Sequence, residues 1–429
     1  MGIICPDEHR KQVRRTAEAR LSEFVGLAEA IGLAIAFADI VRVREVRPST
    51  YIGGGQVEEI ARRVKDGEIE LLLFDAALTP IQQRNLERAT GAKVLDRTAL
   101  ILEIFGERAR TREGVLQVEL AHLNYQKSRL VRSWTHLERQ RGGFGFLGGP
   151  GETQIESDRR LLQERIALIE KRIDKVRKTR AVQRGPRGAV PFPIVALVGY
   201  TNAGKSSLFN TLTGATVEAK NLLFATLDPT VRKLSLPHGR EVMLSDTVGF
   251  IADLPTDLVA AFRATLEEVV EADIILHVRD ISNPDQQAQA ADVLDVLAQL
   301  GVTPESKPFI EVWNKIDLLS PQNAQDANVS LVPAGKVAAS CRVSALTGQG
   351  IPELLLAIET EFASRARVYR VEVPHERGED VGWLYAHSEV ISADEPDETS
   401  TRFHVRVEPR NRDALLLRFK GRVTPSDAP

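Results

Sequence analysis

The sequence predicts an α/β protein of several units, because three kinds of pattern follow one another along the chain. Apolar strand-like runs alternate with helix-like segments up to residue 112 and again between residues 190 and 365. Between these regions lie two long stretches without proline or glycine, which favour helices. Short alternating segments near the end predict further strands. We therefore expect an N-terminal α/β domain (1–112), a helical hairpin (113–189), a second α/β domain (190–365) and a small C-terminal α+β domain (366–429).

Composition excludes several classes of protein. A chain of 429 residues with 43% hydrophobic and 27% charged residues is typical of globular domains. It has no uninterrupted apolar run of about 18 residues, and its first residues become charged too soon for a secretory signal, so we expect no membrane span and a cytoplasmic location. The two cysteines, Cys5 and Cys341, indicate neither a zinc site nor a disulfide scaffold. A net charge of -3 argues against a uniformly basic nucleic-acid binder.

In the first domain, residues 33–46 and 70–74 read as strands, with a helix-like segment at 58–67 between them. The glycine-rich stretch from Thr50 to Gln56 leads into that helix at about Val57. We interpret it as a backbone turn rather than a ligand site, because three neighbouring glycines alone specify little.

The hairpin is predicted from residues 117–141 and 155–183. Apolar residues recur every three or four positions in the second segment, so they form one stripe that can pack against the first helix. The stripe consists of Leu162, Ile166, Ile169, Ile173 and Val176.

Glycines at the tip, from Gly142 to Gly151, predict a loop there because glycine disfavours helix. Phe144 and Phe146 lie near Arg139, Arg141 and a basic run at 171–187, and aromatic rings among cations suit unstacked RNA bases and phosphates. A merely flexible turn remains the alternative. Near the C-terminus, strand-like 368–373 and 403–408 flank an acidic stretch that reads as poor in helix, and the pattern discloses no role for that domain.

A phosphate-binding loop is predicted where the strand-like run 194–199 meets a helix-like segment. Glycines let the backbone wrap a phosphate, Lys205 should reach the β- and γ-phosphates, and the Ser206 hydroxyl should ligate Mg²⁺. The nucleotide-binding candidates in this loop are Gly199, Tyr200, Thr201, Asn202, Ala203, Gly204, Lys205 and Ser206.

Guanine is predicted as the base, because the strand 309–314 ends in N-K-x-D. The carboxylate of Asp317 can accept both adjacent N–H donors of guanine, a pair that adenine does not offer. Neighbouring loops should cover the base. The candidate residues are Asn314, Lys315, Ile316, Asp317, Ser344, Ala345 and Leu346.

Two further segments are predicted to sense the γ-phosphate. The first ends a strand in D-x-x-G, where Asp246 should hold Mg²⁺ and Gly249 should offer its N–H. The second contains two threonines, of which we choose Thr226 over Thr230 as a magnesium ligand. The candidate residues are Phe224, Ala225, Thr226, Leu227, Asp228, Asp246, Thr247, Val248 and Gly249.

The predicted catalytic residues are Lys205, Asn202, Thr226 and Gly249. The ordered motifs are typical of Ras-like GTPases, and their spacing predicts a doubly wound domain with nucleotide at the carboxyl ends of the strands. Ras-type enzymes place a water-orienting glutamine after D-x-x-G, whereas this sequence has Phe250. Asn202 is a candidate ligand for a K⁺ ion that would stabilise transition-state charge; a structural loop bond is the equal alternative.

From about residue 14 to residue 365 the chain resembles the HflX family of GTPases, on segments that include PSTYIGGGQVEEI, GGPGETQIESDRR, GYTNAGKSSLFNTLTG, DTVGF and NKID. The resemblance implies a Ras-like domain of the Obg–HflX group, which typically lacks the catalytic glutamine. It also implies association with the large ribosomal subunit and its RNA, in splitting, rescue or recycling of ribosomes, by a chain that is monomeric when free. Where the family often has a lysine, this sequence has Gly54.

Two hypotheses follow. The chain is a ribosome-associated GTPase that binds GTP and GDP with Mg²⁺, or it is an RNA-binding or RNA-remodelling protein that uses nucleotide only as a conformational switch, with ATP as a further candidate ligand of its N-terminal domain.

Overall fold

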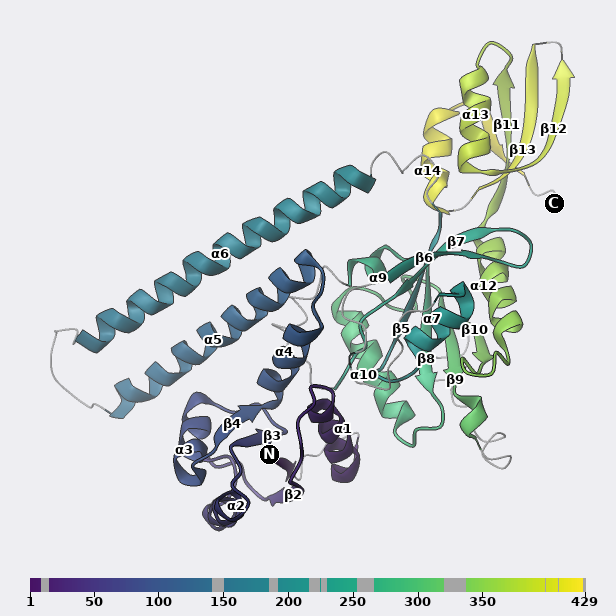
Figure 1. The fold of residues 1–429 in the computed structure, drawn as a ribbon. Helices are drawn as coiled ribbons and strands as arrows, with labels where there is room; N and C mark the ends of the chain where they lie inside the picture. The colour runs from purple at the N-terminus through teal and green to yellow at the C-terminus, as the bar shows by residue number, and fades with distance from the viewer. Residues whose placement is uncertain are drawn as a thin grey trace.

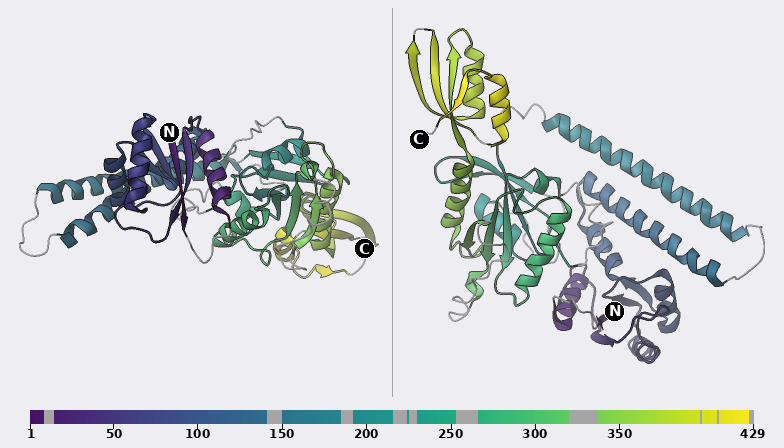
Figure 2. Two further views of the ribbon diagram at one scale, coloured as in Figure 1. Left: turned by 90° about the horizontal axis from the view of Figure 1, so that it is seen from below. Right: turned by 180° about the vertical axis from the view of Figure 1, so that it is seen from behind.

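The computed structural model describes residues 1–8, 15–140, 150–184, 192–215, 224, 230–252, 266–319, 337–397, 399–407 and 409–426. Figure 1 shows two α/β domains side by side, a long helical hairpin that extends away from them, and a small C-terminal domain at the far end of the second α/β domain. The views in Figure 2 show the same arrangement from below and from behind. We call residues 192–365 the central domain.

The N-terminal domain is a parallel four-stranded sheet in the order β2-β1-β3-β4. Its strands are β1 (Gly2–Glu8), β2 (Phe37–Val43), β3 (Leu71–Phe74) and β4 (Lys93–Asp96), and its helices are α1 (Ala17–Glu29), α2 (Gly54–Asp66), α3 (Pro80–Thr90) and α4 (Arg97–Arg108). Strand β1 pairs with both β2 and β3 yet was not predicted, because Pro6, Asp7 and Glu8 interrupt its apolar pattern. Helix α2 begins at Gly54 rather than near Val57, since the Gln56 side chain accepts the Gly53 N–H at 2.9 Å and caps the earlier turn.

The predicted hairpin consists of α5 (Arg112–Gln140) and α6 (Pro150–Arg184). The predicted apolar stripe packs as expected: Ile166, Ile169 and Ile173 of α6 are buried with Leu116 and Leu123 of α5. The tip residues 141–149, with Phe144 and Phe146, lie outside the described residues. The tip loop was predicted to run through Gly151, which is wrong at its end, because α6 already includes Pro150 and Gly151; proline fits the first helical turn, where no N–H donor is needed.

The central domain is a six-stranded sheet in the order β10-β9-β8-β5-β7-β6, in which only β6 runs antiparallel to its neighbour. Its strands are β5 (Ile194–Gly199), β6 (Thr230–Ser235), β7 (Glu241–Asp246), β8 (Ile274–Asp280), β9 (Phe309–Asn314) and β10 (Val337–Arg342). Its helices are α7 (Lys205–Thr213), α9 (Glu267–Glu271), α10 (Gln286–Gln299) and α12 (Ile351–Arg365), with a short 3₁₀ turn, η2 (Ile316–Leu318).

Helices cover both faces of this sheet. Successive strand residues point to opposite sides, so alternate residues pack against different helices. Val195 and Leu197 of β5 are buried in one cluster with Leu208 of α7 and Ile358 of α12. The intervening Val198 lies in another cluster with Leu297 of α10. The predicted doubly wound, Ras-like architecture is therefore present, and it gathers the loops at the carboxyl ends of the parallel strands.

The C-terminal domain is an antiparallel sheet in the order β12-β13-β11-β14. Along the chain it reads β11 (Arg367–Pro374), α13 (Gly378–His387), β12 (Glu389–Asp397), β13 (Ser400–Val407), α14 (Pro409–Arg418) and β14 (Val423–Pro425). The expectation that the acidic stretch is poor in helix is wrong, because α13 lies within it. Gly378 and Gly382 lower the local helix propensity of α13, but Leu384 is fully buried in the core of the domain, and such packing outweighs propensity.

Across the described residues, none of the helices combines the length and the apolar character that a membrane crossing requires.

Candidate nucleotide site

The loop between β5 and α7 requires glycine at two positions. A Cβ on Gly199 would lie 2.2 Å from the Val278 carbonyl oxygen of the neighbouring strand. Gly204 has φ +92°, and a Cβ there would lie 2.2 Å from Nδ2 of Asn314. The backbone can therefore pass close to β8 and to the N-K-x-D segment only because both side chains are absent. The loop then turns directly into α7, whose first N–H groups face the carboxyl edge of the sheet.

Lys205 begins α7, and its ammonium lies inside the loop. Its Nζ donates to the carbonyl oxygens of Gly199 at 3.1 Å and Tyr200 at 2.8 Å. Burial lowers the pKa of this ammonium to about 8, although the nearby Asp246 carboxylate opposes the shift. A Cβ on Gly249 would lie only 3.1 Å from the same Nζ, so the D-x-x-G segment packs closely against the phosphate loop at the lysine.

An oxygen pair suited to a hard divalent cation lies beside this lysine. The Ser206 hydroxyl donates to Oδ2 of Asp246 at 2.7 Å. The buried Thr201 hydroxyl has no hydrogen-bond partner among the residues that the structure describes. Hydroxyl and carboxylate oxygens are the ligands that Mg²⁺ accepts, usually together with water and phosphate. The residues present therefore fit a magnesium ion held between protein and nucleotide.

The first-choice switch ligand, Thr226, lies outside the described residues, as do Ala225, Leu227 and Asp228. Thr230, the second choice, begins β6 and pairs directly with Asp246. Thr247 turns its hydroxyl inward, donating to the Leu197 carbonyl at 2.6 Å, and Val248 is buried.

The N-K-x-D segment joins the phosphate loop to the S-A-L segment. Asn314 donates through Nδ2 to the Ala203 carbonyl at 2.9 Å and accepts the Ala345 N–H at 3.0 Å. The exposed Asp317 carboxylate accepts from the Ser344 hydroxyl at 2.6 Å. These contacts bring together the residues expected to hold and read a base, at one edge of the sheet.

Lys315 has φ +68°, and its ammonium contacts Asp280 at the end of β8 at 2.6 Å. Ile316 opens the 3₁₀ turn that carries Asp317. This pairing holds the lysine stem beside the segment that carries the base-reading candidate.

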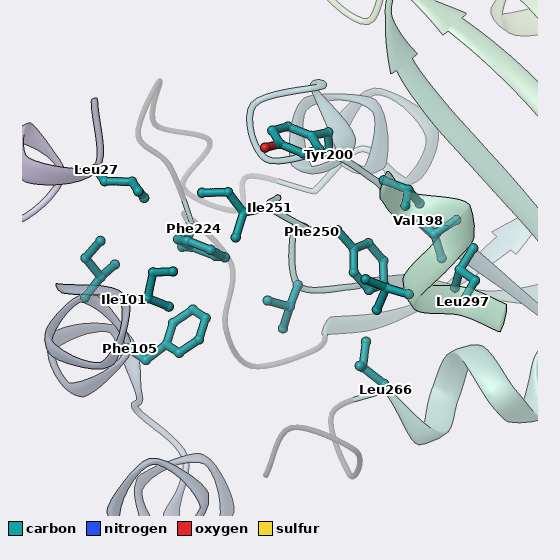
Figure 3. Close-up of a cluster of buried hydrophobic side chains, with 14 of the residues drawn as sticks. Leu27, Ile101, Phe105, Val198, Tyr200, Phe224, Phe250, Ile251, Leu266 and Leu297 are labelled. Carbon is teal, nitrogen blue, oxygen red and sulfur yellow. The ribbon is translucent and has the colours of Figure 1, made fainter. Parts of the chain in front are cut away.

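Three of the predicted nucleotide-site residues have side chains in surroundings that differ from those of the residues above. Leu346 is 84% exposed, so only its backbone can serve a site. Asn202 is exposed and has φ +60°. Phe224 has a buried side chain that packs edge-to-face against Phe105 of α4, with ring centroids 4.7 Å apart (Figure 3). Its ring therefore contributes to the contact between the two α/β domains rather than facing a nucleotide.

A polar cluster around Tyr200 was not predicted. The Tyr200 hydroxyl donates to Glu23 of α1 and accepts from Arg15 at 2.8 Å and from the Ala252 N–H at 2.9 Å. Burial, followed by the Glu23 charge, raises the pKa of this phenol well above its ordinary value, so it stays protonated. Glu23 also accepts from Arg97 at 2.6 Å. Tyr200 lies in the phosphate-loop motif, but no local motif marks its contacts, because the partners are far apart in sequence.

Comparison with known proteins agrees with this geometry. Four family models match the chain: a GTP-binding GTPase N-terminal region at residues 18–106, a GTP-binding GTPase middle region at 108–187, a 50S ribosome-binding GTPase at 194–315, and an HflX C-terminal domain at 331–426. A GTPase HflX from Magnetococcus marinus is 48% identical over 96% of this chain and 93% of its own. A GTPase HflX from Escherichia coli is 44% identical over 83% of this chain and 82% of its own.

Among solved structures, a GTP-binding protein from Sulfolobus solfataricus in complex with GDP matches 84% of this chain and 98% of its own, at 24% identity and a TM-score of 0.42. The full-length match to the sequence relatives carries the assignment: the chain belongs to the HflX family of GTPases, enzymes that bind and hydrolyse GTP.

Proposed function

We propose that this GTPase holds Mg²⁺-GTP at the loop from Gly199 to Ser206 and acts on the large ribosomal subunit, in splitting, rescue or recycling of ribosomes. Ser206 and Asp246 hold the magnesium ion, with Thr226 as the further ligand. When bound, Mg²⁺ neutralises charge on the β- and γ-phosphates. The Lys205 ammonium turns from the loop carbonyls toward the phosphates, and the Gly249 N–H donates to the γ-phosphate.

Asp317 reads the guanine edge while Ser344 fixes one of its oxygens. Asn314 bonds both neighbouring loops, so it ties the S-A-L segment to the phosphate loop. Asn202, whose side chain is exposed in this loop, would hold K⁺ against the phosphates. Stimulation of GTP turnover by K⁺ over Na⁺, lost in Asn202→Ala, tests that assignment.

The hairpin supports the ribosomal part of the proposal. On α6, Lys171, Arg172, Lys175 and Lys178 are exposed, while Ile173 between them is buried against α5. The apolar contact between α5 and α6 thus leaves a basic face exposed on α6. The helix pair extends away from the two α/β domains (Figure 1). Such a face binds RNA phosphates with strong salt dependence. The match of the central domain to a 50S ribosome-binding GTPase family agrees with an RNA-rich partner.

Sedimentation with purified large subunits tests the proposal. We expect the chain to co-sediment with a non-hydrolysable GTP analogue more than with GDP, and subunits to accelerate GTP turnover. The double variant Lys175→Glu, Lys178→Glu should reduce binding and flatten its salt dependence. Arg62→Glu, Lys65→Glu is the matched control, because it reverses two exposed charges at the same helical spacing on α2. Absence of co-sedimentation in every nucleotide state, or equal loss in both variants, would contradict the proposal.

A further inference from the structure

Strand β8 ends at Asp280, whose carboxylate is bonded through both of its oxygens. In the pairing of β8 with β9, Asp280 lies opposite Asn314 of the N-K-x-D segment. Its Oδ1 accepts from the Ser282 N–H at 3.0 Å and from the Ser282 hydroxyl at 2.5 Å. Its Oδ2 accepts from the Lys315 ammonium at 2.6 Å. The loop after β8 therefore fixes the direction in which this carboxylate meets the lysine.

The Lys315 side chain runs beside the phosphate loop to reach this carboxylate. Lys315 precedes the turn that carries Asp317, and its backbone has φ +68°. Farther along the side chain, Cε lies 3.9 Å from the position that a Cβ on Gly204 would take. The side chains of Lys315 and Asp280 are 23% and 12% exposed, so salt screens their attraction only weakly. The four-carbon stem of the lysine is thus fixed at both ends.

The two lysines of the site have partners of different charge. Lys205 donates to two neutral backbone carbonyls, those of Gly199 and Tyr200, which an anionic phosphate can replace. Lys315 already faces a full negative charge on Asp280. We therefore expect its ammonium to stay at Asp280 when nucleotide binds, so that the apolar stem, rather than the charge, lies against the base.

We propose that Asp280 is a positioning residue for the nucleotide, which holds the Lys315 stem as a preformed wall of the base pocket and so sets how long GDP and GTP stay bound. This role rests on the base site proposed above at Asp317. A stem that is already ordered loses little rotamer freedom when the base docks, whereas a free lysine stem would have to be ordered each time. The contacts of Asp280 in the described part of the chain include neither Asp317 nor Lys205, so base choice and hydrolysis should stay unchanged without its charge.

Release of fluorescently labelled GDP, chased with unlabelled GDP, measures this role. Asp280→Asn keeps the shape of the side chain and removes the charge that holds the ammonium. We expect the dissociation rate to rise about tenfold, with the association rate changed less than about twofold, because losing one partner of an ion pair acts mainly on dissociation. Glu241→Gln is the matched control. It neutralises the carboxylate that Lys233 contacts at 2.5 Å, at the end of β7 far from Asp246, and should leave the release rate within about twofold.

Lys315→Met supplies a double-mutant cycle. Methionine keeps an unbranched stem and lacks the ammonium, so release should again be about tenfold faster. Asp280→Asn should add less than about twofold to Lys315→Met, because the carboxylate acts only through the ammonium. A carboxylate that merely stabilised the loop after β8 would instead accelerate release by the same factor in both backgrounds.

Two further measurements separate this role from the base site itself. In Asp280→Asn, single-turnover hydrolysis at saturating GTP and the preference for GDP over ADP should both remain, whereas Asp317→Asn should lose the preference for guanine. Ser282→Ala removes one bond that aims the carboxylate, so we expect release about threefold faster even where Asp280→Asn does not fold. Unchanged release in Asp280→Asn, or in Ser282→Ala where that variant alone folds, would overturn the proposal. So would a lost preference for GDP in Asp280→Asn, an equal rise in Glu241→Gln, or an undiminished effect of Asp280→Asn in the Lys315→Met background.

Discussion

At the scale of single residues, Phe250 has no polar side-chain group, so its polar contacts come from its backbone alone. Its ring is 3% exposed and lies near Val198, Leu266 and Leu297 (Figure 3). A polar residue there would be buried without a partner, at a cost of about 1–3 kcal/mol. The apolar ring thus stabilises the segment, while the N–H and C=O groups of Phe250 bond the Gly199 carbonyl and the Thr201 N–H of the phosphate loop.

Base choice should depend on Asp317. We expect Asp317→Asn to weaken GTP binding about ten- to hundredfold, because an amide cannot accept from both guanine donors, and to favour xanthosine triphosphate. Competition of labelled GTP by both nucleotides measures this. Ser344→Ala serves as the control, since it removes only the hydroxyl that donates to Asp317 and should keep the preference for guanine. An unaltered preference in Asp317→Asn would show that another group reads the base.

Nucleotide affinity should depend on pH through Lys205. Its ammonium has a pKa of about 8 in the buried loop, and an anionic phosphate beside it would raise that pKa. Binding then takes up a proton in alkaline solution, so GDP affinity should fall by up to about tenfold between pH 7 and pH 9. Calorimetry in two buffers of different ionisation enthalpy measures the uptake. Lys205→Arg should remove the dependence, whereas affinity that rises with pH would contradict the assignment.

At the scale of elements, the hairpin is stabilised by a narrow seam. Ile169 is 1% exposed within it, and its neighbour Leu168 is 49% exposed on the outer face. Adjacent residues of one helix thus have opposite environments.

Ile169→Ala should destabilise the hairpin by about 2–5 kcal/mol, because it leaves a cavity in an apolar cluster that, among the described residues, consists of α5 and α6 side chains. Leu168→Ala should change stability by less than about 0.5 kcal/mol. Hydrogen exchange of the α5 amides, together with the thermal unfolding transition, measures the loss of stability in both variants. Equal effects of the two substitutions would mean that the seam does not hold the pair together.

Elements with strong local signals were predictable from the sequence. The hairpin stripe and the phosphate loop were foreseen because spacing and glycine placement are properties of a short segment. β1 and α13 were missed, because in each case partners distant in sequence supply the stability: β1 through pairing with β2 and β3, α13 through the burial of Leu384. The hydrogen bond between Tyr200 and Glu23 joins residues 177 positions apart, so no short segment of the sequence predicts it.

At the scale of the whole molecule, nucleotide and ribosome should be linked. If a GTP analogue raises affinity for the large subunit by some factor, the subunit must raise affinity for the analogue by the same factor. Equilibrium binding of the labelled analogue, with and without subunits, measures the factor for the analogue. Sedimentation with and without the analogue measures the factor for the subunit. Unequal factors would indicate that a third component is present.

The join between α12 and β11 has a mechanical consequence. Ala366 alone separates Arg365, the last residue of the helix, from Arg367, the first of the strand. So short a connection links the orientation of β11 to that of α12, because it leaves little chain that could bend between them. A tilt of α12 by about 10° would sweep the far end of β11 through roughly 5 Å, given the rise of a strand of this length. A small rearrangement of the central domain beneath α12 would thus produce a larger displacement of the C-terminal sheet.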